Sequence, residues 1–409
     1  MGYAKQAFIG VSWAGALRFI TRGISFLRTI ALARILIPAQ FGIYGVASLV
    51  LALLEVFTET GVNVILVQEN ANIKKFINSA WIISIIRGTI IAFAIYVSAP
   101  FVSDFFHSKE SLSVLRLISI APFLRGFINP TVVRFQKELE FHKEFWYRIF
   151  IFLTDAIVSI VVALYTHQAY SLVFGMIAGV ILEIILSFWL VKPRPHFAFE
   201  KEYLSKIIHR GKWVTASSIF NYLFHNADNI IVGKILGTTS LGLYQMAYAL
   251  SIIPITEISD VISKVTFPVF SKIAQDRTRL KNAFLKTLIV VSVMSVPFGL
   301  ALFFFPKIII QLVLGDKWLK IASVLPLLAI FGVIRGISGY TSTLFLSLKK
   351  QEYVSMVTLL SLVGLLVPIV PLVLRFGIAG AAVAALIGTF LALPLMVYFT
   401  LKEIVKKDV

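Results

Sequence analysis

Long apolar stretches follow one another along almost the whole chain, and they restrict the possible folds more than any other feature. A helix needs about 20 largely apolar residues to cross the hydrocarbon layer of a bilayer. Twelve stretches of this sequence come near that length: 8–34, 41–67, 78–100, 112–133, 146–166, 169–191, 212–236, 241–268, 284–305, 319–346, 353–374 and 378–401. The sequence therefore predicts an all-α polytopic membrane protein with about 12 transmembrane helices.

The composition excludes the other broad classes of protein. Hydrophobic residues make up 58% of the chain and charged residues 14%, whereas soluble domains have about 25% charged residues. Such a chain is neither soluble nor disordered. The absence of cysteine excludes disulfides, thiolate metal sites and cysteine nucleophiles. Three arginines, Arg18, Arg22 and Arg28, interrupt the first stretch, so we expect no cleaved signal peptide.

The basic residues sort to one side of the predicted spans. With the N-terminus inside, the inner segments hold 24 Lys and Arg residues, and the outer segments hold Lys109, Lys307, Lys317, Lys320 and Arg375. Basic residues favour the cytoplasmic side. We expect a multi-pass protein of the inner or plasma membrane with both termini in the cytoplasm. The net charge of +18 is then a matter of orientation, and we expect no nucleic acid as a partner.

An internal repeat with a constant offset of 200 residues relates the two halves of the chain. The segment 33–47 resembles 233–247, and the same offset aligns Trp13 with Trp213. The identical pairs in the segment are Ile35/Ile235, Leu36/Leu236, Gly42/Gly242, Tyr44/Tyr244 and Ala47/Ala247. A weaker match at offset 210 pairs Arg125-Gly126 with Arg335-Gly336. Chance matching of common apolar residues does not readily explain Gly, Tyr and Trp agreeing at one offset.

The repeat predicts two lobes of six helices each. We expect an N-lobe at residues 1–191, a cytoplasmic linker at 192–211 that contains Pro193 and Pro195, and a C-lobe at 212–409. An even number of helices brings both lobes into the membrane from the same side, so a pseudo-twofold axis along the membrane normal relates them. Two such bundles around a central cavity are typical of alternating-access transporters.

The first predicted helix has a polar face that three arginines dominate. On a helical wheel, an arc of about 120° holds three arginines and three hydroxyl side chains: Arg18, Thr21, Arg22, Ser25, Arg28 and Thr29. Charged residues within spans are costly and point to a cavity by default. Guanidinium groups suit phosphate oxygens, so this face is a candidate pyrophosphate site, to which Arg125 and Arg335 are added. The alternatives are that the arginines snorkel, pair with Glu55 or Glu59, or belong to a helix lying flat on the membrane.

The seventh predicted helix carries a polar face at the corresponding places. It is formed by Ser217, Ser218, Asn221, His225, Asp228 and Asn229. Together with Ser25, Glu55 and Glu59, the residues Asn221, His225, Asp228 and Asn229 are candidates for polar cavity residues or an ion-coupling site. A packed hydrogen-bond network is an equal alternative. We expect no metal at His225, because no second His or pair of carboxylates lies at ligand spacing, and we expect no cofactor.

No motif of a catalytic site occurs in the sequence. It contains no Gly-rich phosphate loop, no His-Glu-x-x-His and no Gly-x-Ser-x-Gly. The acids of the loops are scattered, and the loops are too short to form a catalytic domain. We therefore expect a transporter rather than an enzyme.

Three segments carry a resemblance to a known family. Residues 31–45 resemble the junction of helices 1 and 2 in bacterial and archaeal polysaccharide exporters, residues 226–244 resemble their helix 7–8 junction, and Phe267-Pro-Val-Phe-Ser adds to the match. The chain thereby resembles Wzx-type polysaccharide and O-antigen flippases of the multidrug/oligosaccharidyl-lipid/polysaccharide (MOP) superfamily. The resemblance covers nearly the whole chain and implies a MATE-like fold of two six-helix lobes.

The resemblance implies a function in the synthesis of lipopolysaccharide or another surface polysaccharide. Such flippases turn polyprenyl-pyrophosphate-linked oligosaccharides from the inner to the outer leaflet. The implied partners are this lipid-linked oligosaccharide and the lipid bilayer, with a polysaccharide polymerase and glycosyltransferases as further candidates. A lipid II flippase is less favoured, because those relatives usually have fourteen helices.

Two other functions stay open. A multidrug or organic-cation antiporter of the same superfamily calls for acidic cavity residues, whereas the first helix offers arginines. The other is a non-transporting membrane scaffold of a glycan-assembly complex. The sequence leaves open whether transport is coupled to protons, to sodium or to no ion.

Overall fold

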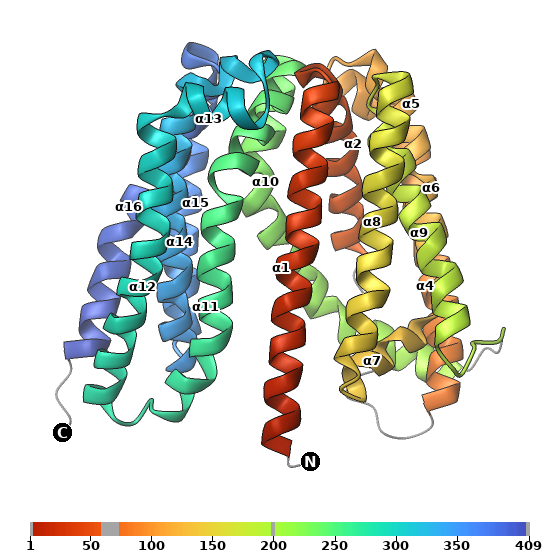
Figure 1. Cartoon of the computed structure of the whole chain (residues 1–409), viewed down its shortest axis with the longest axis horizontal. Helices are drawn as coiled ribbons and strands as arrows, with labels where there is room; N and C mark the ends of the chain where they lie inside the picture. The colour runs from red at the N-terminus through yellow and green to blue at the C-terminus, as the bar shows by residue number, and fades with distance from the viewer. Residues whose placement is uncertain (1–2, 59–72, 198–200, 406–409) are drawn as a thin grey trace. The chain divides into compact units, whose positions relative to one another are not determined.

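The computed structural model describes the backbone of residues 3–58, 73–197 and 201–405. Side chains are described in the same ranges except at 3–12, 14, 73–76, 201–221, 224 and 405. Every secondary-structure element in these ranges is a helix. The chain divides into two compact units, Met1–Asn226 and Ala227–Val409, which Figure 1 shows together with the element labels.

The first unit consists of long helices joined by short connections. Its elements are α1 (Tyr3–Ile35), α2 (Pro38–Phe57), α4 (Ile73–Phe105), α5 (Lys109–Ile118), α6 (Ile120–Arg125), the 3₁₀ helix η1 (Pro130–Val133), α7 (Arg134–Lys137), α8 (Phe141–Thr166) and α9 (Tyr170–Leu190). Pro38 occupies the first turn of α2, after Ile37 in an extended conformation. A proline fits there because the first turn has no partner for its missing N–H.

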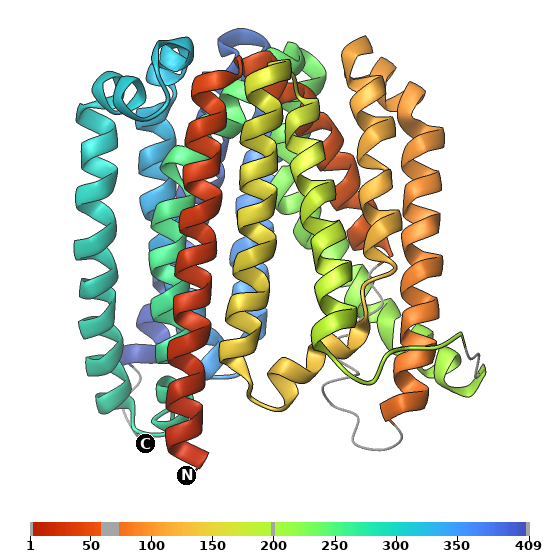
Figure 2. The same cartoon turned by 45° about the vertical axis from the view of Figure 1, so that its right-hand side comes forward.

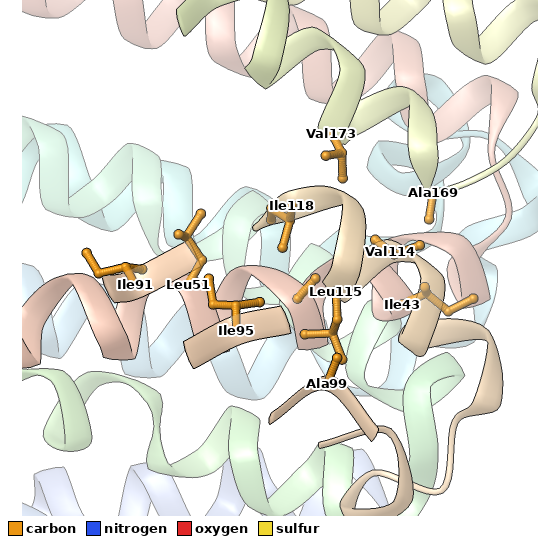
Figure 3. Packing of buried hydrophobic residues seen from close by; sticks show 11 residues of the cluster. Ile43, Leu51, Ile91, Ile95, Ala99, Val114, Leu115, Ile118, Ala169 and Val173 are labelled. Atoms are coloured by element: carbon orange, nitrogen blue, oxygen red, sulfur yellow. The ribbon is translucent and has the colours of Figure 1, made fainter. Parts of the chain in front are cut away.

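Small and branched apolar side chains fill the core of the first unit. Figure 3 shows the cluster in which Ile43 of α2, Ile95 of α4, Leu115 of α5 and Val173 of α9 are all buried. On another side of this unit, Leu32 of α1 packs with residues of α8 and α9. Apolar packing thus holds α1, which bears three of the candidate arginines, against α8 and α9.

The helix α10 (Lys201–Ser251) crosses the boundary between the units, and its later part opens the second unit. Its helical geometry is interrupted at Gly237, where φ is 80° and ψ is 178°. This conformation favours glycine, because a Cβ atom strains the backbone there. The predicted linker 192–211 includes the start of α10 at Lys201.

The remaining elements of the second unit form a bundle in which neighbouring helices are joined in sequence. They are α11 (Ile253–Lys272), α12 (Arg277–Phe304), α13 (Pro306–Val313), the 3₁₀ helix η2 (Asp316–Ser323), α14 (Leu325–Ser347), α15 (Gln351–Phe376) and α16 (Ile378–Val405). The start of α12 is capped by Asp276, whose carboxylate accepts a hydrogen bond from the Arg279 N–H at 2.9 Å. Phe270, Phe284 and Tyr340 are buried between α11, α12 and α14.

The described helices confirm a polytopic membrane fold, whereas the count of twelve spans is not confirmed. Among the described residues, eight helices are long and apolar enough to span a bilayer, and ten if two bent pairs each count as one span. The predicted stretches 112–133 and 241–268 are wrong in their continuity, because the chain bends by 70° and 42° within them. The predicted stretch 41–67 is helical only to Phe57 in the described part. The stretch 319–346 begins as a 3₁₀ helix.

Candidate functional site

Arg28 links three helices of the first unit. Its guanidinium forms an ion pair with the Asp155 carboxylate of α8 at 3.0 Å. It also donates to the Ser159 hydroxyl at 2.9 and 3.1 Å and to the Leu172 carbonyl of α9 at 3.4 Å. The side chains of the pair are only 16% and 20% exposed. The charge of Arg28 is therefore compensated within its own unit.

A glycine allows α9 to approach this ion pair. A Cβ atom on Gly175 would lie 1.8 Å from the Ser159 hydroxyl and 2.6 Å from an Asp155 carboxylate oxygen. Any side chain at residue 175 would displace the two groups that hold Arg28.

A second cluster of the first unit surrounds Glu55 near the end of α2. The Glu55 carboxylate pairs with Arg125 of α6, and its backbone carbonyl accepts a hydrogen bond from Arg87 of α4 at 2.7 Å. Arg87 also donates to the Thr58 hydroxyl at 3.0 Å. Both Glu55 and Arg125 are about one-third exposed. Glu55, weighed as a partner for the arginines of the first helix, thus has a partner on α6.

The second unit contains a buried carboxylate, that of Asp228, which is 4% exposed. One of its oxygens accepts hydrogen bonds from the Asn229 N–H at 2.8 Å and from the Asn229 amide at 3.1 Å. The other oxygen accepts one from the Tyr244 hydroxyl at 2.9 Å. Within the described part of the chain, no Lys or Arg lies within salt-bridge distance of Asp228. Three neutral donors stabilise this carboxylate instead.

Arg335 lies half-buried in the middle of α14. Its guanidinium donates to the Tyr248 hydroxyl and lies over two rings, 5.8 Å from the centre of Tyr248 and 5.5 Å from that of Phe331. No carboxylate among the described residues forms an ion pair with Arg335. Aromatic faces attract a cation without neutralising it. Arg335 is therefore held by a hydroxyl and two aromatic rings rather than by an ion pair.

Residues that correspond in the repeat have similar neighbours in the two units. Residues 28 and 228 correspond at the offset of 200, as do Tyr44 and Tyr244. In the first unit Tyr44 lies close enough to Arg28 for electrostatic interaction, and in the second unit Tyr244 binds Asp228. Arg28 pairs with Asp155 and Asp228 accepts from Tyr244, so each of these charged groups has a partner inside its own unit.

The other predicted residues of α1 have mixed surroundings. Arg18 is half-buried and Arg22 is exposed. The hydroxyls of Thr21 and Thr29 bond back to carbonyls of their own helix, that of Thr29 to the Ser25 carbonyl. Ser25 itself is half-buried.

Of the remaining predicted residues, His225 is exposed on α10. The side chain of Asn221 and the whole of Glu59 lie outside the described residues. Among the described residues, no group of His, Asp and Glu side chains could hold a metal ion.

Sequence reasoning missed several residues of these clusters. Asp155 and Ser159 were not singled out, although a carboxylate inside the predicted span 146–166 is itself a signal. Tyr248 was missed because an aromatic side chain in an apolar stretch looks like core. Tyr244 was recognised for its match to Tyr44 but not for its bond to Asp228.

Comparison with known proteins identifies the family of this chain. The family model described as "Polysaccharide biosynthesis protein" matches residues 31–323. The chain belongs to this family. Lipopolysaccharide biosynthesis protein WzxC of Escherichia coli (strain K12) is 24% identical over 354 residues, which cover 86% of this chain and 72% of WzxC. Teichuronic acid biosynthesis protein TuaB of Bacillus subtilis (strain 168) is 23% identical over 313 residues, or 73% and 62% of the two chains.

Solved structures of transporters share the fold of this family member. The lipid II flippase MurJ in an inward closed conformation matches with a TM-score of 0.74 at 15% identity, covering 95% of this chain and 88% of MurJ. An inward-facing multidrug resistance MATE family transporter of the MOP superfamily matches with a TM-score of 0.70 at 16% identity, covering 96% and 98%. At such identities the likeness concerns the fold. The chain is a multi-pass membrane protein with a MATE- and MurJ-like fold.

Proposed function

We propose that this protein is a flippase that moves polyprenyl-pyrophosphate-linked oligosaccharides from the inner to the outer leaflet for the synthesis of a surface polysaccharide. Family membership supports a role in polysaccharide biosynthesis. The names of the relatives point the same way, since TuaB and WzxC are named for polysaccharide synthesis and MurJ for flipping a lipid-linked precursor. The observation that carries the proposal is that the half-buried Arg335 has no ion-pair partner among the described residues.

The guanidinium of Arg335 and its surroundings are suited to binding a diphosphate. Its guanidinium is always charged, and it offers several N–H donors in a fork that fits two phosphate oxygens. The Tyr248 hydroxyl occupies part of this fork. The rings of Tyr248 and Phe331 lie close to the guanidinium. In a low-dielectric setting an anion at this point gains more than it would in water.

The other candidate arginines take different parts in the proposal. Arg18 and Arg22 on α1 are proposed as further contacts for the pyrophosphate. Arg28 and Arg125 have carboxylate partners at Asp155 and Glu55, so their first role is to hold the helices of the first unit together. They contribute to substrate binding only when those ion pairs open.

The proposed transport cycle is alternating access between two lobes, residues 1–191 and 212–409, joined by the linker 192–211. The proposed location is the inner or plasma membrane, with both termini in the cytoplasm. The sorting of 24 basic residues to one side against five to the other supports this orientation. A polysaccharide polymerase and glycosyltransferases are proposed as protein partners, because they would supply and consume the lipid-linked glycan.

One observation favours a second candidate, the organic-cation antiporter. The Asp228 carboxylate is buried without a Lys or Arg partner in the described part of the chain, and such a group could attract a cation. It accepts hydrogen bonds from three donors, however, and it lies within electrostatic reach of Arg335. These neighbours favour an anion at Arg335 over an organic cation at Asp228.

Transport in proteoliposomes tests the proposal. The purified chain is reconstituted with a fluorescent polyprenyl-pyrophosphate-linked oligosaccharide, and the fraction of label that an impermeant quencher reaches is followed over time. Arg335→Gln should slow flipping about 10- to 100-fold, since hydrogen bonds to charged groups contribute about 1.5–3 kcal/mol. The matched control is Arg375→Gln, which removes an exposed arginine from the last turn of α15.

The outcomes separate the candidates. Flipping that depends on Arg335 but not on Arg375 supports the flippase. Efflux of an organic cation without flipping would favour the antiporter, and neither activity would favour a scaffold. Flipping at the wild-type rate in Arg335→Gln would show that this arginine does not bind the transported charge.

A further inference from the structure

The second unit contains an added segment of about ten residues that the first unit lacks, after the end of α12. In the first unit, α4 ends at Phe105 and α5 begins at Lys109. At the matching place in the second unit, α12 ends at Phe304 and α14 begins only at Leu325, and α13 and η2 lie between them. The repeat offset rises from 200 to 210 across this connection. Figures 1 and 2 place α13 and η2 over this end of α12. One half of the duplicated fold has thus gained a structure of its own.

An apolar groove of about 300 Å³ lies at the same end of α12. It runs between the stretch from Val296 to Phe304 of α12 and the stretch from Ala329 to Ile334 of α14, and every lining residue is apolar. Leu300 and Phe303 on its wall are 49% and 40% exposed. At 1.5 Å per residue, the α12 wall is about 12 Å long. Its shape and lining suit a hydrocarbon chain rather than a polar ligand.

The added segment places positive charge next to this groove. Lys307 of α13 and Lys317 and Lys320 of η2 are exposed. On α13, the apolar Ile308 and Leu312 are also exposed, at 62% and 74%. A short helix with exposed apolar and basic side chains beside a membrane span is typical of the bilayer surface. This composition suits the depth of lipid phosphates, and the apolar lining of the groove suits the depth of lipid chains.

We propose that the groove between α12 and α14, with its lysine-bearing cap, binds the polyprenyl phosphate part of the transported lipid. The isoprenoid chain lies in the groove and the phosphate lies at Lys307 and Lys320. The proposal rests on the proposed flippase function, since it names where the carrier of that substrate is held.

The position of Arg335 favours the carrier over an ordinary membrane phospholipid. Ile334 lines the groove, and the next residue, Arg335, points to Tyr248 on α10. The proposed pyrophosphate contact and the proposed chain contact are thus neighbours on one helix. A lipid whose phosphate binds Arg335 during transport can leave its hydrocarbon chain in the groove on the other face of α14. The charge distribution predicts that the lysines are on the outer side, so they suit the position of the head group after it has crossed.

The test measures binding of an unglycosylated polyprenyl phosphate to the full chain in phosphatidylcholine nanodiscs, by native mass spectrometry. Leu300→Trp fills the groove and should abolish saturable binding. Val293→Trp is the matched control, because Val293 is a 64% exposed residue of α12 outside the groove. This control should bind as the unmodified chain does.

A second pair of variants tests the head group and does not alter any packed residue. Lys307→Gln combined with Lys320→Gln should weaken binding about 30-fold, since each basic residue near a membrane surface contributes about fivefold. Lys281→Gln combined with Lys286→Gln removes two exposed lysines near the opposite end of α12 and should change nothing.

Two results would overturn the proposal. One is binding that survives Leu300→Trp. The other is displacement by phosphatidylglycerol as effective as that by polyprenyl phosphate, which would make the groove a site for bulk anionic lipid. The assay needs neither glycan nor translocation, so its failure leaves the flippase proposal intact. If the wild-type chain binds the carrier in this groove but does not flip it, the flippase proposal is contradicted and the binding-site proposal is not.

Discussion

The ion pair between Arg28 and Asp155 leads to a quantitative prediction about stability. Arg28→Met removes the cation and leaves the half-buried Asp155 carboxylate with the hydrogen bond from the Ser159 hydroxyl, at 3.2 Å. Asp155→Leu leaves the guanidinium in the same position. Each single substitution should destabilise the protein, and the double substitution should cost much less than the sum of the two.

The magnitude follows from the geometry of the pair. Two unit charges 3.0 Å apart attract each other by about 5.5 kcal/mol at an effective dielectric constant of 20. Desolvation opposes part of this gain, and breaking a buried pair typically costs about 3–5 kcal/mol. We expect a coupling energy of about 2–3 kcal/mol between Arg28 and Asp155. Hydrogen bonds between transmembrane helices average about 0.6 kcal/mol, so the expected coupling is large enough to tell an ion pair from a hydrogen bond.

The assay is reversible unfolding in mixed micelles by titration with SDS, applied to the wild type, both single variants and the double variant. The matched control is the exposed pair Arg134 and Glu138, whose atoms lie 2.7 Å apart and whose side chains are 40% and 43% exposed. That pair should show a coupling of about 0.5 kcal/mol or less. Equal coupling in the two cycles would refute the reasoning, because burial would then make no difference.

Three further predictions concern other parts of the molecule. Tyr244→Phe removes one of three donors to the buried Asp228 carboxylate and should lower the free energy of unfolding by about 1–3 kcal/mol; an unchanged SDS midpoint would contradict the bond. Gly175→Ala places a methyl group 1.8 Å from the Ser159 hydroxyl and should destabilise the protein by about 1–3 kcal/mol in the same titration, whereas wild-type stability would mean that α8 and α9 are not packed this closely. A reporter fused after Val409 should be active only if the reporter works in the cytoplasm, and activity of a periplasmic reporter there would overturn the predicted orientation.

The spans of this fold could be predicted wherever a long apolar stretch forms one straight helix. The predicted stretches 146–166 and 169–191 fall within or close to α8 and α9. The bends could not be found in the same way, because the residues on both sides of a bend are equally apolar. The break before α11 lies at Ile252, and Pro254 occupies the first turn of the next helix. Proline marked the place, but hydropathy does not distinguish a broken span from a continuous one.

The charges of the candidate site could be predicted, but their partners could not. A helical wheel places Arg28 on the polar arc of its own helix, and the rarity of charge in a span marks it as special. The wheel does not say which helix faces that arc. Asp155 is 127 residues away in the chain, and only the packing of α1 on α8 brings the two together. The same holds for Arg335 and Tyr248, which are 87 residues apart.

The difference in charge compensation between the two units decides which arginine tests transport most directly. Alanine at Arg28 would remove the ion-pair partner of the half-buried Asp155. Loss of surface glycan in such a variant would therefore combine lost transport with lost stability. A triple substitution of Arg18, Arg22 and Arg28 has the same defect. Removal of the Arg335 guanidinium takes a partner only from the Tyr248 hydroxyl and two aromatic rings. These neutral groups tolerate the loss. A neutral side chain at residue 335 therefore changes the charge that a transported anion would meet and breaks no ion pair in the described part of the chain.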